Sequence, residues 1–181
     1  AIHAQGMAHR DIKPGNILIT IGGRPVLLDF GSAREVTQDQ VQTRALVVSD
    51  GYSAPELYAQ GARQGQRSDV YSCAATLYRL VAGQCPVKAD YRVYEMRAQG
   101  RPDPLLPPGK AAGVSINRCL EKAVLRGMTL EYDQRPASIE QFKGSLRWGF
   151  SPPDLHELQK ILESGMKLTR DVLWRVRKQQ R

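Results

Sequence analysis

The sequence predicts a mostly helical fold with a single small β-hairpin near its N-terminus. Two short apolar runs, residues 17–20 and 25–28, flank a pair of glycines, which is typical of two strands joined by a tight turn. Residues 31–53 show no sustained periodicity, and from Ser68 onward the apolar residues recur at helical spacing. The residues that could carry chemistry are concentrated in the first 56 positions.

The first long helix is expected over residues 68–82. Ser68 is expected to cap it, Asp69 suits its first turn, and Gly83 is expected to end it. Its apolar face would comprise Val70, Cys73, Ala74, Leu77, Leu80 and Val81.

Shorter helices are expected over residues 90–98, 115–127 and 138–147, with a loop over the proline-rich residues 100–110. The inward residues of the second of these helices would be Ile116, Cys119, Leu120, Ala123 and Val124. Beyond Gly149, two more helical stretches are expected near the C-terminus.

The composition is that of an ordinary globular domain. The chain has 181 residues, of which 41% are apolar and 24% charged, which argues against a disordered or fibrous chain. Its apolar runs are far too short to span a bilayer, and we find no secretory signal. Cys73, Cys85 and Cys119 form no CxxC pair, so we expect free, buried thiols in a reducing compartment.

The net charge of +8 is concentrated at one end of the sequence. Residues 166–181 contain six basic residues and one acidic residue, and therefore carry five of the eight net charges. The rest of the chain carries only +3, so the basic character bears on location or partners and not on the body of the domain.

Three short motifs occur in order within the first 56 residues. Residues 9–16 are HRDIKPGN, residues 29–31 are DFG directly after the second expected strand, and residues 54–56 are APE. Together, with a hairpin between the first two, they make residues 1–147 similar to the C-terminal lobe of Hanks-type (eukaryotic-like) Ser/Thr protein kinases. The resemblance implies a mostly α fold, in which the small hairpin carries the catalytic loop and DFG.

The resemblance implies transfer of the γ-phosphoryl group of ATP, with Mg²⁺, to a Ser or Thr hydroxyl of a protein substrate. Asp11 resembles the base that orients this hydroxyl, and Lys13 resembles the cation that contacts the nucleotide and offsets charge on the transferred group. Asn16 and Asp29 resemble the ligands that hold the metal against the phosphates, because Mg²⁺ prefers oxygen donors.

Other residues resemble the apolar parts of such a site. Leu18 resembles the floor under an adenine ring, and its neighbours Ile17 and Ile19 fit either that floor or ordinary core packing. His9 and Phe30 resemble the pair that stacks between the catalytic loop and the hairpin.

Three residues farther along the chain resemble structural supports of the site. Asp69 resembles the Asp at a helix start that accepts hydrogen bonds from the catalytic-loop backbone. Glu56 and Arg135 resemble a buried ion pair that ties the activation segment to the last helices. Breaking such a pair costs about 3–5 kcal/mol, so its role is structural.

The loop 32–53 corresponds to the activation segment. Arg10 precedes the catalytic Asp, which marks kinases whose loop is commonly ordered by phosphorylation. Thr37 and Thr43 are the candidate phosphosites, and Thr43 is preferred. Ser49 stands where family members have a Thr hydrogen-bonded to the catalytic Asp and Lys, but residues 47–51 depart from the usual Gly-Thr-Pro run, which leaves substrate specificity open.

The sequence contains no GxGxxG loop, no strand Lys of the VAIK type and no helix Glu to pair with it. The resemblance places these parts in an N-lobe upstream of Ala1, so we expect the chain alone to be inactive. The alternative function is a pseudokinase-like binding or scaffolding module, which the complete set of catalytic and metal-ligating residues disfavours. A small-molecule kinase of the same fold is disfavoured by the long APE-closed segment.

Residues 148–181 are expected to form a helical, basic C-terminal extension. A packed accessory helix with a solvated basic face is the favoured interpretation of its last part. A juxtamembrane segment that contacts an anionic membrane is the second, and would make the chain the cytoplasmic part of a membrane-anchored kinase. A nucleic-acid-binding arm is disfavoured, because Trp174 is its one stacking aromatic. We expect a cytoplasmic location.

Overall fold

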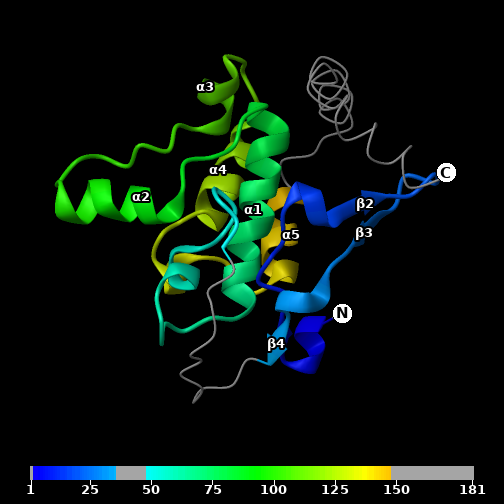
Figure 1. Ribbon diagram of the computed structural model, residues 1–181. Coiled ribbons are helices and arrows are strands. Elements are labelled where there is room, and N and C mark those ends of the chain that lie inside the picture. Colours follow the sequence, from blue (N-terminus) through cyan, green and yellow to red (C-terminus); the bar gives the residue numbers. More distant parts are fainter. Residues whose placement is uncertain (1, 36–47, 148–181) are drawn as a thin grey trace.

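The computed structural model describes residues 2–35 and 48–147, and in this part of the chain helices predominate (Figure 1). The longest helix, α1 (Gln66–Ala82), runs through the middle of the body. The other helices are α2 (Ala89–Val93), α3 (Pro108–Ala112), α4 (Arg118–Gly127) and α5 (Ile139–Arg147). Single turns of 3₁₀ or π type lie at η1 (Ile2–Gln5), η2 (Pro14–Asn16), η3 (Phe30–Ser32), η4 (Pro55–Tyr58), η5 (Tyr94–Ala98) and η6 (Tyr132–Gln134). The predicted mostly α fold is confirmed.

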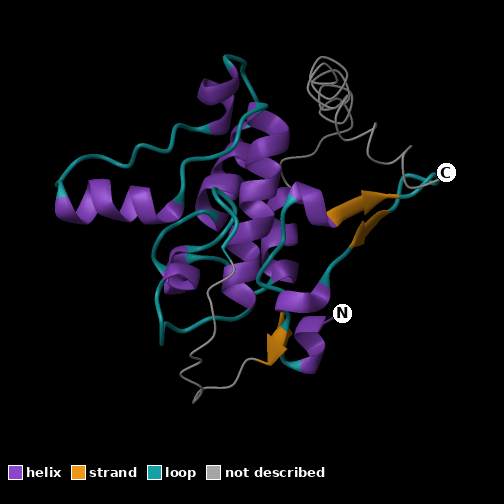
Figure 2. Cartoon of the chain, viewed as in Figure 1, coloured by secondary structure: helices purple, strands orange, loops and turns teal. Residues whose placement is uncertain are grey.

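The predicted hairpin is present and projects from one edge of the helical body (Figure 2). Strand β2 (Ile17–Ile19) pairs antiparallel with β3 (Pro25–Leu27), and Ile17 lies opposite Leu27. The turn between them uses Gly23 at a φ of 75°, a left-handed conformation that glycine adopts at little cost.

A second, shorter ladder was not expected from the sequence. Strand β1 (Met7–Ala8) pairs antiparallel with β4 (Arg34–Glu35), with Ala8 opposite Arg34. Two residues are too few to produce an alternating pattern that sequence analysis can detect. The ladder joins the two ends of residues 9–33, and it therefore closes the base of the segment that contains the HRD motif, the hairpin and DFG.

Helix α1 begins two residues before the expected start. Gly65 occupies the N-cap position, and Ser68 lies inside the first turn, where its hydroxyl accepts a hydrogen bond from the Gly65 amide (3.2 Å). The prediction that Ser68 is the cap was therefore wrong by one turn. Gly83 ends the helix as expected, in a left-handed conformation with a φ of 69°.

The hydrophobic core lies where α1 packs against α4 and α5. Its central members are Val70, Tyr71, Ala74, Leu120, Val124, Met128 and Phe142, all of them buried. Gly127 allows the closest approach, because a Cβ at this position would lie 2.6 Å from the Cβ of Ala74. The α1–α4 crossing therefore requires glycine here.

Several local expectations were wrong. Residues 108–112, which overlap the end of the proline-rich loop expected over residues 100–110, form α3, and Pro108 is its first helical residue. Helix α4 starts at Arg118 because Asn117 Oδ1 accepts hydrogen bonds from the Cys119 and Leu120 amides. Cys119 therefore lies on the exposed side of the first turn, and Cys85 is exposed too, so neither is the buried thiol that we expected. All three cysteines are free, as expected.

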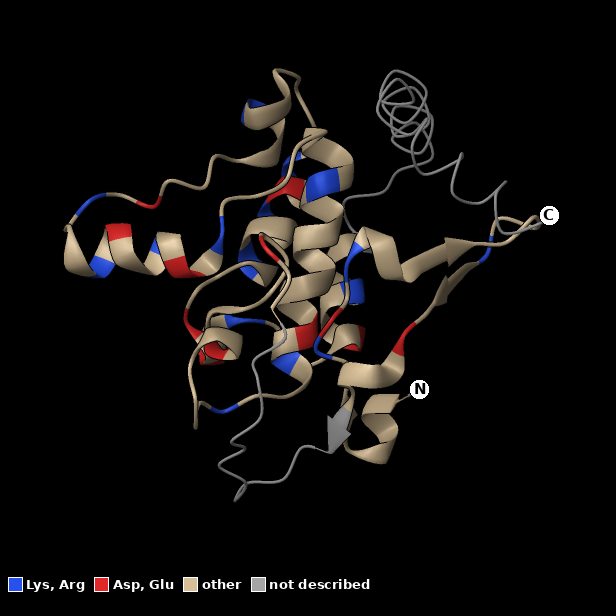
Figure 3. Ribbon diagram, in the orientation of Figure 1, with Lys and Arg blue, Asp and Glu red and all other residues tan. Residues whose placement is uncertain are grey.

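Positions of charged residues of both signs are interspersed along the ribbon of the described body (Figure 3). No helix within residues 2–35 and 48–147 is both long and apolar enough to cross a membrane. The helical stretches expected after residue 147 and the boundary placed there lie outside the described residues.

Candidate active site

The carboxylate of Asp11 is the centre of the site. It is nearly buried, with 6% of the residue exposed, and three side chains donate hydrogen bonds to it. Ser49 Oγ donates to Oδ1 over 2.6 Å, and Lys13 Nζ and Asn16 Nδ2 each lie 2.8 Å from Oδ2. Lys13 Nζ also donates to Ser49 Oγ over 2.8 Å. The HRD loop and the segment around Ser49 are therefore joined through one carboxylate, one ammonium group and one hydroxyl.

These contacts determine the protonation state of Asp11. Burial alone would raise the pKa of this carboxyl group, but the hydrogen bond and charge of Lys13, with the hydrogen bonds from Ser49 and Asn16, lower the pKa below its usual value. Asp11 is therefore ionised at neutral pH and can accept a hydrogen bond from an incoming hydroxyl.

The hairpin brings the two expected metal ligands to one end of its strands. Next to the Ile17–Leu27 pair, the Leu28 amide donates a hydrogen bond to the backbone carbonyl of Asn16 (2.8 Å). Asp29 is the next residue after Leu28, so Asn16 and Asp29 lie at the same end of the hairpin. Asp29 has a φ of 59°, and its Oδ1 accepts a hydrogen bond from the Gly31 amide over 3.1 Å.

The donor chemistry at this end of the hairpin suits Mg²⁺. The side-chain Nδ2 of Asn16 donates hydrogen bonds to Asp11, so the side-chain Oδ1 of Asn16 is the atom left to bind a metal. Asp29 is exposed. Two hard oxygen groups are what Mg²⁺ takes from a protein when substrate phosphates supply further ligands. Among the described residues no group of three or more His, Cys, Asp or Glu forms a metal cluster.

The apolar residues of the hairpin lie at the surface. Leu18 is 37% exposed and Ile19 is 60% exposed, so the core-packing alternative was wrong for Ile19, while Ile17 is half-buried. The place of Leu18 under an adenine ring stays a prediction. His9 and Phe30 meet edge to face with ring centroids 5.0 Å apart, which is the expected contact between the catalytic loop and DFG.

Asp69, at the start of α1, accepts hydrogen bonds from the backbone of the HRD loop, as expected. Asp69 is fully buried, and its two oxygens accept hydrogen bonds from the His9 and Arg10 amides, both over 2.8 Å. Arg10 has a φ of 68°, which is unusual for a residue with a side chain and costs about 1–3 kcal/mol. The bonds to Asp69 stabilise this turn, so Asp69 helps to set the direction in which Asp11 leaves the backbone.

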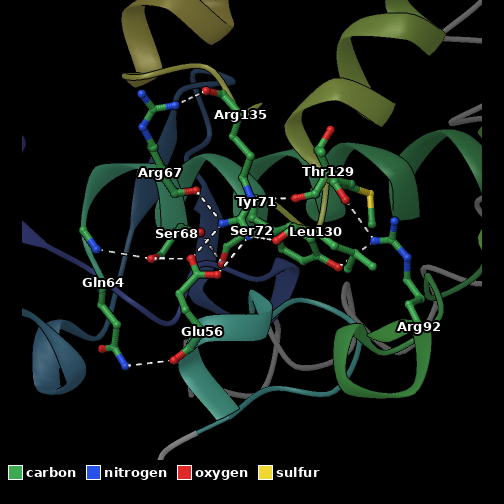
Figure 4. A network of polar contacts seen from close by, with 12 residues as sticks. Glu56, Gln64, Arg67, Ser68, Tyr71, Ser72, Arg92, Thr129, Leu130 and Arg135 are labelled. Atoms are coloured by element: carbon green, nitrogen blue, oxygen red, sulfur yellow. Dashed lines mark hydrogen bonds and ion pairs between the residues drawn. The ribbon is translucent and has the colours of Figure 1, made fainter. Parts of the chain in front are cut away.

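The expected pair of Glu56 and Arg135 lies at the centre of a buried polar network (Figure 4). The guanidinium group binds the carboxylate with two hydrogen bonds, of 2.7 and 2.9 Å, and stacks 5.0 Å from the centroid of the Tyr71 ring. It also donates to the carbonyls of Thr129 and Leu130. Ser68 Oγ donates to Glu56 over 2.7 Å. The APE motif is thereby tied to α1 and to the segment before α5.

Asp50 and Gly51, which follow Ser49, contact residues to which the sequence analysis gave no role in the site. Gly51 has a φ of 81°, and a Cβ there would lie 2.5 Å from Cys85 Sγ and 2.7 Å from the Pro86 carbonyl. Asp50 forms an ion pair with Lys88 over 2.6 Å. These contacts join residues more than 30 positions apart, so no local sequence pattern predicts them. Thr37 and Thr43, the candidate phosphosites, lie outside the described residues.

Comparison with known proteins identifies the family. The chain belongs to the protein kinase family, whose domain model matches residues 1–104, more than half of the chain. It is 32% identical over 146 residues to the serine/threonine-protein kinase PknB of Mycobacterium leprae, covering 80% of this chain and 23% of that protein. It is 30% identical over 170 residues to PknD of Mycobacterium tuberculosis, covering 93% of this chain and 25% of that protein.

The described structure is also similar to a solved structure, the apo form of PpkA-294. The TM-score is 0.63 at 28% sequence identity, with 80% of this chain and 48% of that chain covered. The chain thus spans about a quarter of the length of the curated relatives it matches.

Proposed function

We propose that this chain contributes the catalytic loop and metal-binding residues of a serine/threonine protein kinase. The observation that carries the proposal is the arrangement around Asp11, where an ionised carboxylate, the Lys13 ammonium group and the Asn16 amide meet within 2.8 Å. The names of the bacterial relatives, which are serine/threonine-protein kinases, support the same substrate class. We place Asp11 and Lys13 in catalysis, Lys13, Asn16, Leu18 and Asp29 at the nucleotide, and Asn16 and Asp29 at the metal.

In the proposed reaction, the oxygen of a substrate Ser or Thr hydroxyl forms a bond to the γ-phosphorus of ATP, and the bond between that phosphorus and the ADP oxygen breaks. Mg²⁺ bound with the nucleotide supplies charge neutralisation at the phosphates. Asp11 accepts the hydrogen bond of the attacking hydroxyl and receives its proton as the bond forms. Lys13, which lies beside Asp11, offsets the negative charge on the transferred group.

The alternative is a pseudokinase-like module that binds partners without transferring phosphate. The intact set of Asp11, Lys13, Asn16 and Asp29 favours catalysis, because a docking surface has no need of an oriented base or of two oxygen ligands at the hairpin end. A lysine that anchors the phosphates and a Gly-rich loop are not in this sequence, so we propose that the 181 residues alone do not transfer phosphate.

The test uses the longest natural protein that contains this sequence, measured for Mg²⁺-dependent ATP binding and for transfer of radiolabelled phosphate to casein. We expect both in the wild type, and in Asp29→Ala we expect loss of Mg²⁺-dependent binding and of transfer. Asp133→Ala, which changes an exposed aspartate on η6, is the matched control and is expected to retain both. ATP binding without any transfer in the wild type would instead support the pseudokinase alternative.

A further inference from the structure

Gly51 fits against the rest of the fold more closely than the other described glycines that have a positive φ. A Cβ at Gly51 would lie 2.5 Å from Cys85 Sγ and 2.7 Å from the Pro86 carbonyl oxygen, whereas at those other glycines it would meet no atom within 4 Å. The thiol can turn aside by rotation about one bond, but the carbonyl oxygen belongs to the backbone of a buried residue. The close approach therefore requires a residue without a side chain.

The residues on either side of Gly51 lie against the same short segment, which follows α1. Cys85 Sγ donates a weak hydrogen bond to the Asp50 carbonyl over 3.5 Å. Burial, and next the charge that a Cys85 thiolate would carry, raise the pKa of the Tyr52 hydroxyl to about 12, so the Tyr52 side chain is also close to Cys85. Residues 50–52 are thus supported together at this surface.

A tight turn connects this contact to Ser49. The Ser49 carbonyl accepts hydrogen bonds from the Tyr52 and Ser53 amides, both over 2.9 Å, and the Ser49 amide donates to Ser53 Oγ over 2.8 Å. Gly51 lies between the two ends of this turn, so a shift of Gly51 without a shift of Ser49 would strain or break these hydrogen bonds. We therefore expect residues 49–53 to move as a unit.

The Ser49 side chain carries the position of the turn to the proposed base. Ser49 Oγ donates to Asp11 Oδ1 over 2.6 Å and accepts from Lys13 Nζ over 2.8 Å. A Cβ at residue 51 would stand about 0.7 Å inside an ordinary contact distance of 3.4 Å from the Pro86 carbonyl oxygen. If the turn moves by this amount along the bond from Ser49 to Asp11, the bond lengthens to about 3.3 Å, beyond the usual limit of about 3.0 Å for a hydroxyl donor.

We propose that Gly51 is a positioning residue, whose close contact with the Pro86 carbonyl holds the Ser49 hydroxyl on the proposed base. Its effect on rate rests on the proposed kinase function, whereas its effect on the hydrogen bond between Ser49 and Asp11 does not. The proposal names the steric contact, and not the left-handed backbone, as the property that matters.

Gly61 provides a matched control for the left-handed backbone. Its φ is 73°, close to the 81° of Gly51, and a Cβ there would meet no atom within 4 Å. Alanine at either position is strained by the positive φ and lowers stability for that reason. Only Gly51→Ala also brings a Cβ onto a backbone oxygen, so the difference between the two variants isolates the contact.

The first test compares crystal structures of the longest natural protein that contains this sequence, in the wild type, Gly51→Ala and Gly61→Ala. We expect the distance from Ser49 Oγ to Asp11 Oδ1 to exceed about 3.2 Å in Gly51→Ala and to keep its wild-type value in Gly61→Ala. An unchanged distance in Gly51→Ala, or equal lengthening in both variants, would overturn the proposal. So would unfolding of Gly51→Ala alone, because the contact would then hold the fold together and not the hydroxyl.

The second test measures phosphate transfer to casein by the same proteins. We expect kcat to fall about tenfold or more in Gly51→Ala, with KM for ATP unchanged, and to stay at the wild-type value in Gly61→Ala. Because Gly51 would act through the Ser49 hydroxyl, the double variant Gly51→Ala/Ser49→Ala should be no slower than Ser49→Ala alone. Falls that multiply in the double variant would overturn the proposal.

The two tests separate the role of Gly51 from the kinase function. An inactive wild type, together with the expected change in the distance from Ser49 to Asp11, would refute the kinase function and leave the positioning role of Gly51 standing. An active wild type with equal kcat in Gly51→Ala and Gly61→Ala would refute the role of Gly51 alone.

Discussion

Ser49 Oγ and Asp11 Oδ1 lie 2.6 Å apart, and the same hydroxyl accepts a hydrogen bond from Lys13. The segment around Ser49 is therefore connected to the proposed base by a side chain that also touches the proposed charge stabiliser. Ser49 in this role replaces the threonine expected for the family, and the hydroxyl makes both of the contacts that the resemblance implied.

The first prediction concerns this hydroxyl. Ser49→Ala is expected to lower kcat about 10- to 100-fold, because a hydrogen bond to a charged group contributes about 1.5–3 kcal/mol. Ser49→Thr, which keeps the hydroxyl, is the matched control and is expected to stay close to the wild-type rate. Steady-state phosphate transfer by the longest natural protein that contains this sequence measures both, and full activity in Ser49→Ala would show that the contact does not contribute to catalysis.

The second prediction concerns the protonation of Asp11. Burial raises the pKa of this carboxyl group, but its hydrogen bonds and the charge of Lys13 lower the pKa below its usual value. The hydrogen bond from Lys13 is the largest of these lowering contributions. Lys13→Met is therefore expected to raise the pKa of Asp11, as measured by carboxyl-carbon NMR titration. Lys110→Met, an exposed lysine on α3, should leave it unchanged.

The same lowered pKa has a consequence for stability. A carboxyl group whose folded-state pKa is lowered stabilises the fold above its unfolded pKa, about 3.9, and loses this contribution as the pH falls through the folded value. Between pH 5 and pH 2 the free energy of unfolding should therefore fall less steeply in Lys13→Met than in the wild type. Identical pH profiles would contradict the assignment of Lys13 as the main partner.

The third prediction concerns the buried pair below the APE motif. Arg135→Met leaves the Glu56 carboxylate buried without its bidentate partner, and we expect the free energy of unfolding to fall by about 3–5 kcal/mol. Arg63→Met is the control, because Arg63 and Asp133 form an exposed pair that contributes at most about 1 kcal/mol. Urea unfolding followed by circular dichroism compares the two, and equal losses would contradict the structural role of the buried pair.

The fourth prediction concerns residues 166–181. We propose that this basic segment packs as an accessory helix, so its removal should not change co-sedimentation with phosphatidylserine vesicles. Salt-sensitive binding that disappears on removal of the segment would instead support a juxtamembrane role, because each basic residue near an anionic leaflet contributes about 1 kcal/mol. Such a result would also support the proposal that the chain is the cytoplasmic part of a membrane-anchored kinase.

Local sequence patterns predicted the larger elements well. The hairpin around Gly23 and the helix that ends at Gly83 follow from periodicity and from glycines that the backbone requires. The β1–β4 ladder is too short to predict, because each strand has two residues. Helix α3 contradicts the predicted loop, because proline is favourable as the first residue of a helix as well as in loops. The helix predicted over residues 115–127 begins too early, because Asn117 caps α4 and Arg118 is its first residue. For this reason the prediction that Cys119 faces the core is wrong.

Contacts of the candidate site could be predicted where both residues lie within one sequence motif. Asp11 and Asn16 lie five positions apart, so the HRDIKPGN window contains their contact. Ser49 and Asp69 were found through the resemblance alone, since they reach the loop from 38 and about 60 positions away. His3 and Lys88 had neither a motif nor a resemblance to mark them, because their partners, Asp69 and Asp50, are close only in the folded chain.

The central claim is that Asp11 is the base of a phosphoryl transfer to a protein hydroxyl. The most direct measurement is single-turnover transfer from MgATP to casein by the longest natural protein that contains this sequence, in the wild type, Asp11→Asn and the control Asp133→Asn. The account predicts transfer to serine and threonine in the wild type and the control, and a rate at least 100-fold lower in Asp11→Asn with ATP binding retained. Transfer by Asp11→Asn at the wild-type rate would contradict it.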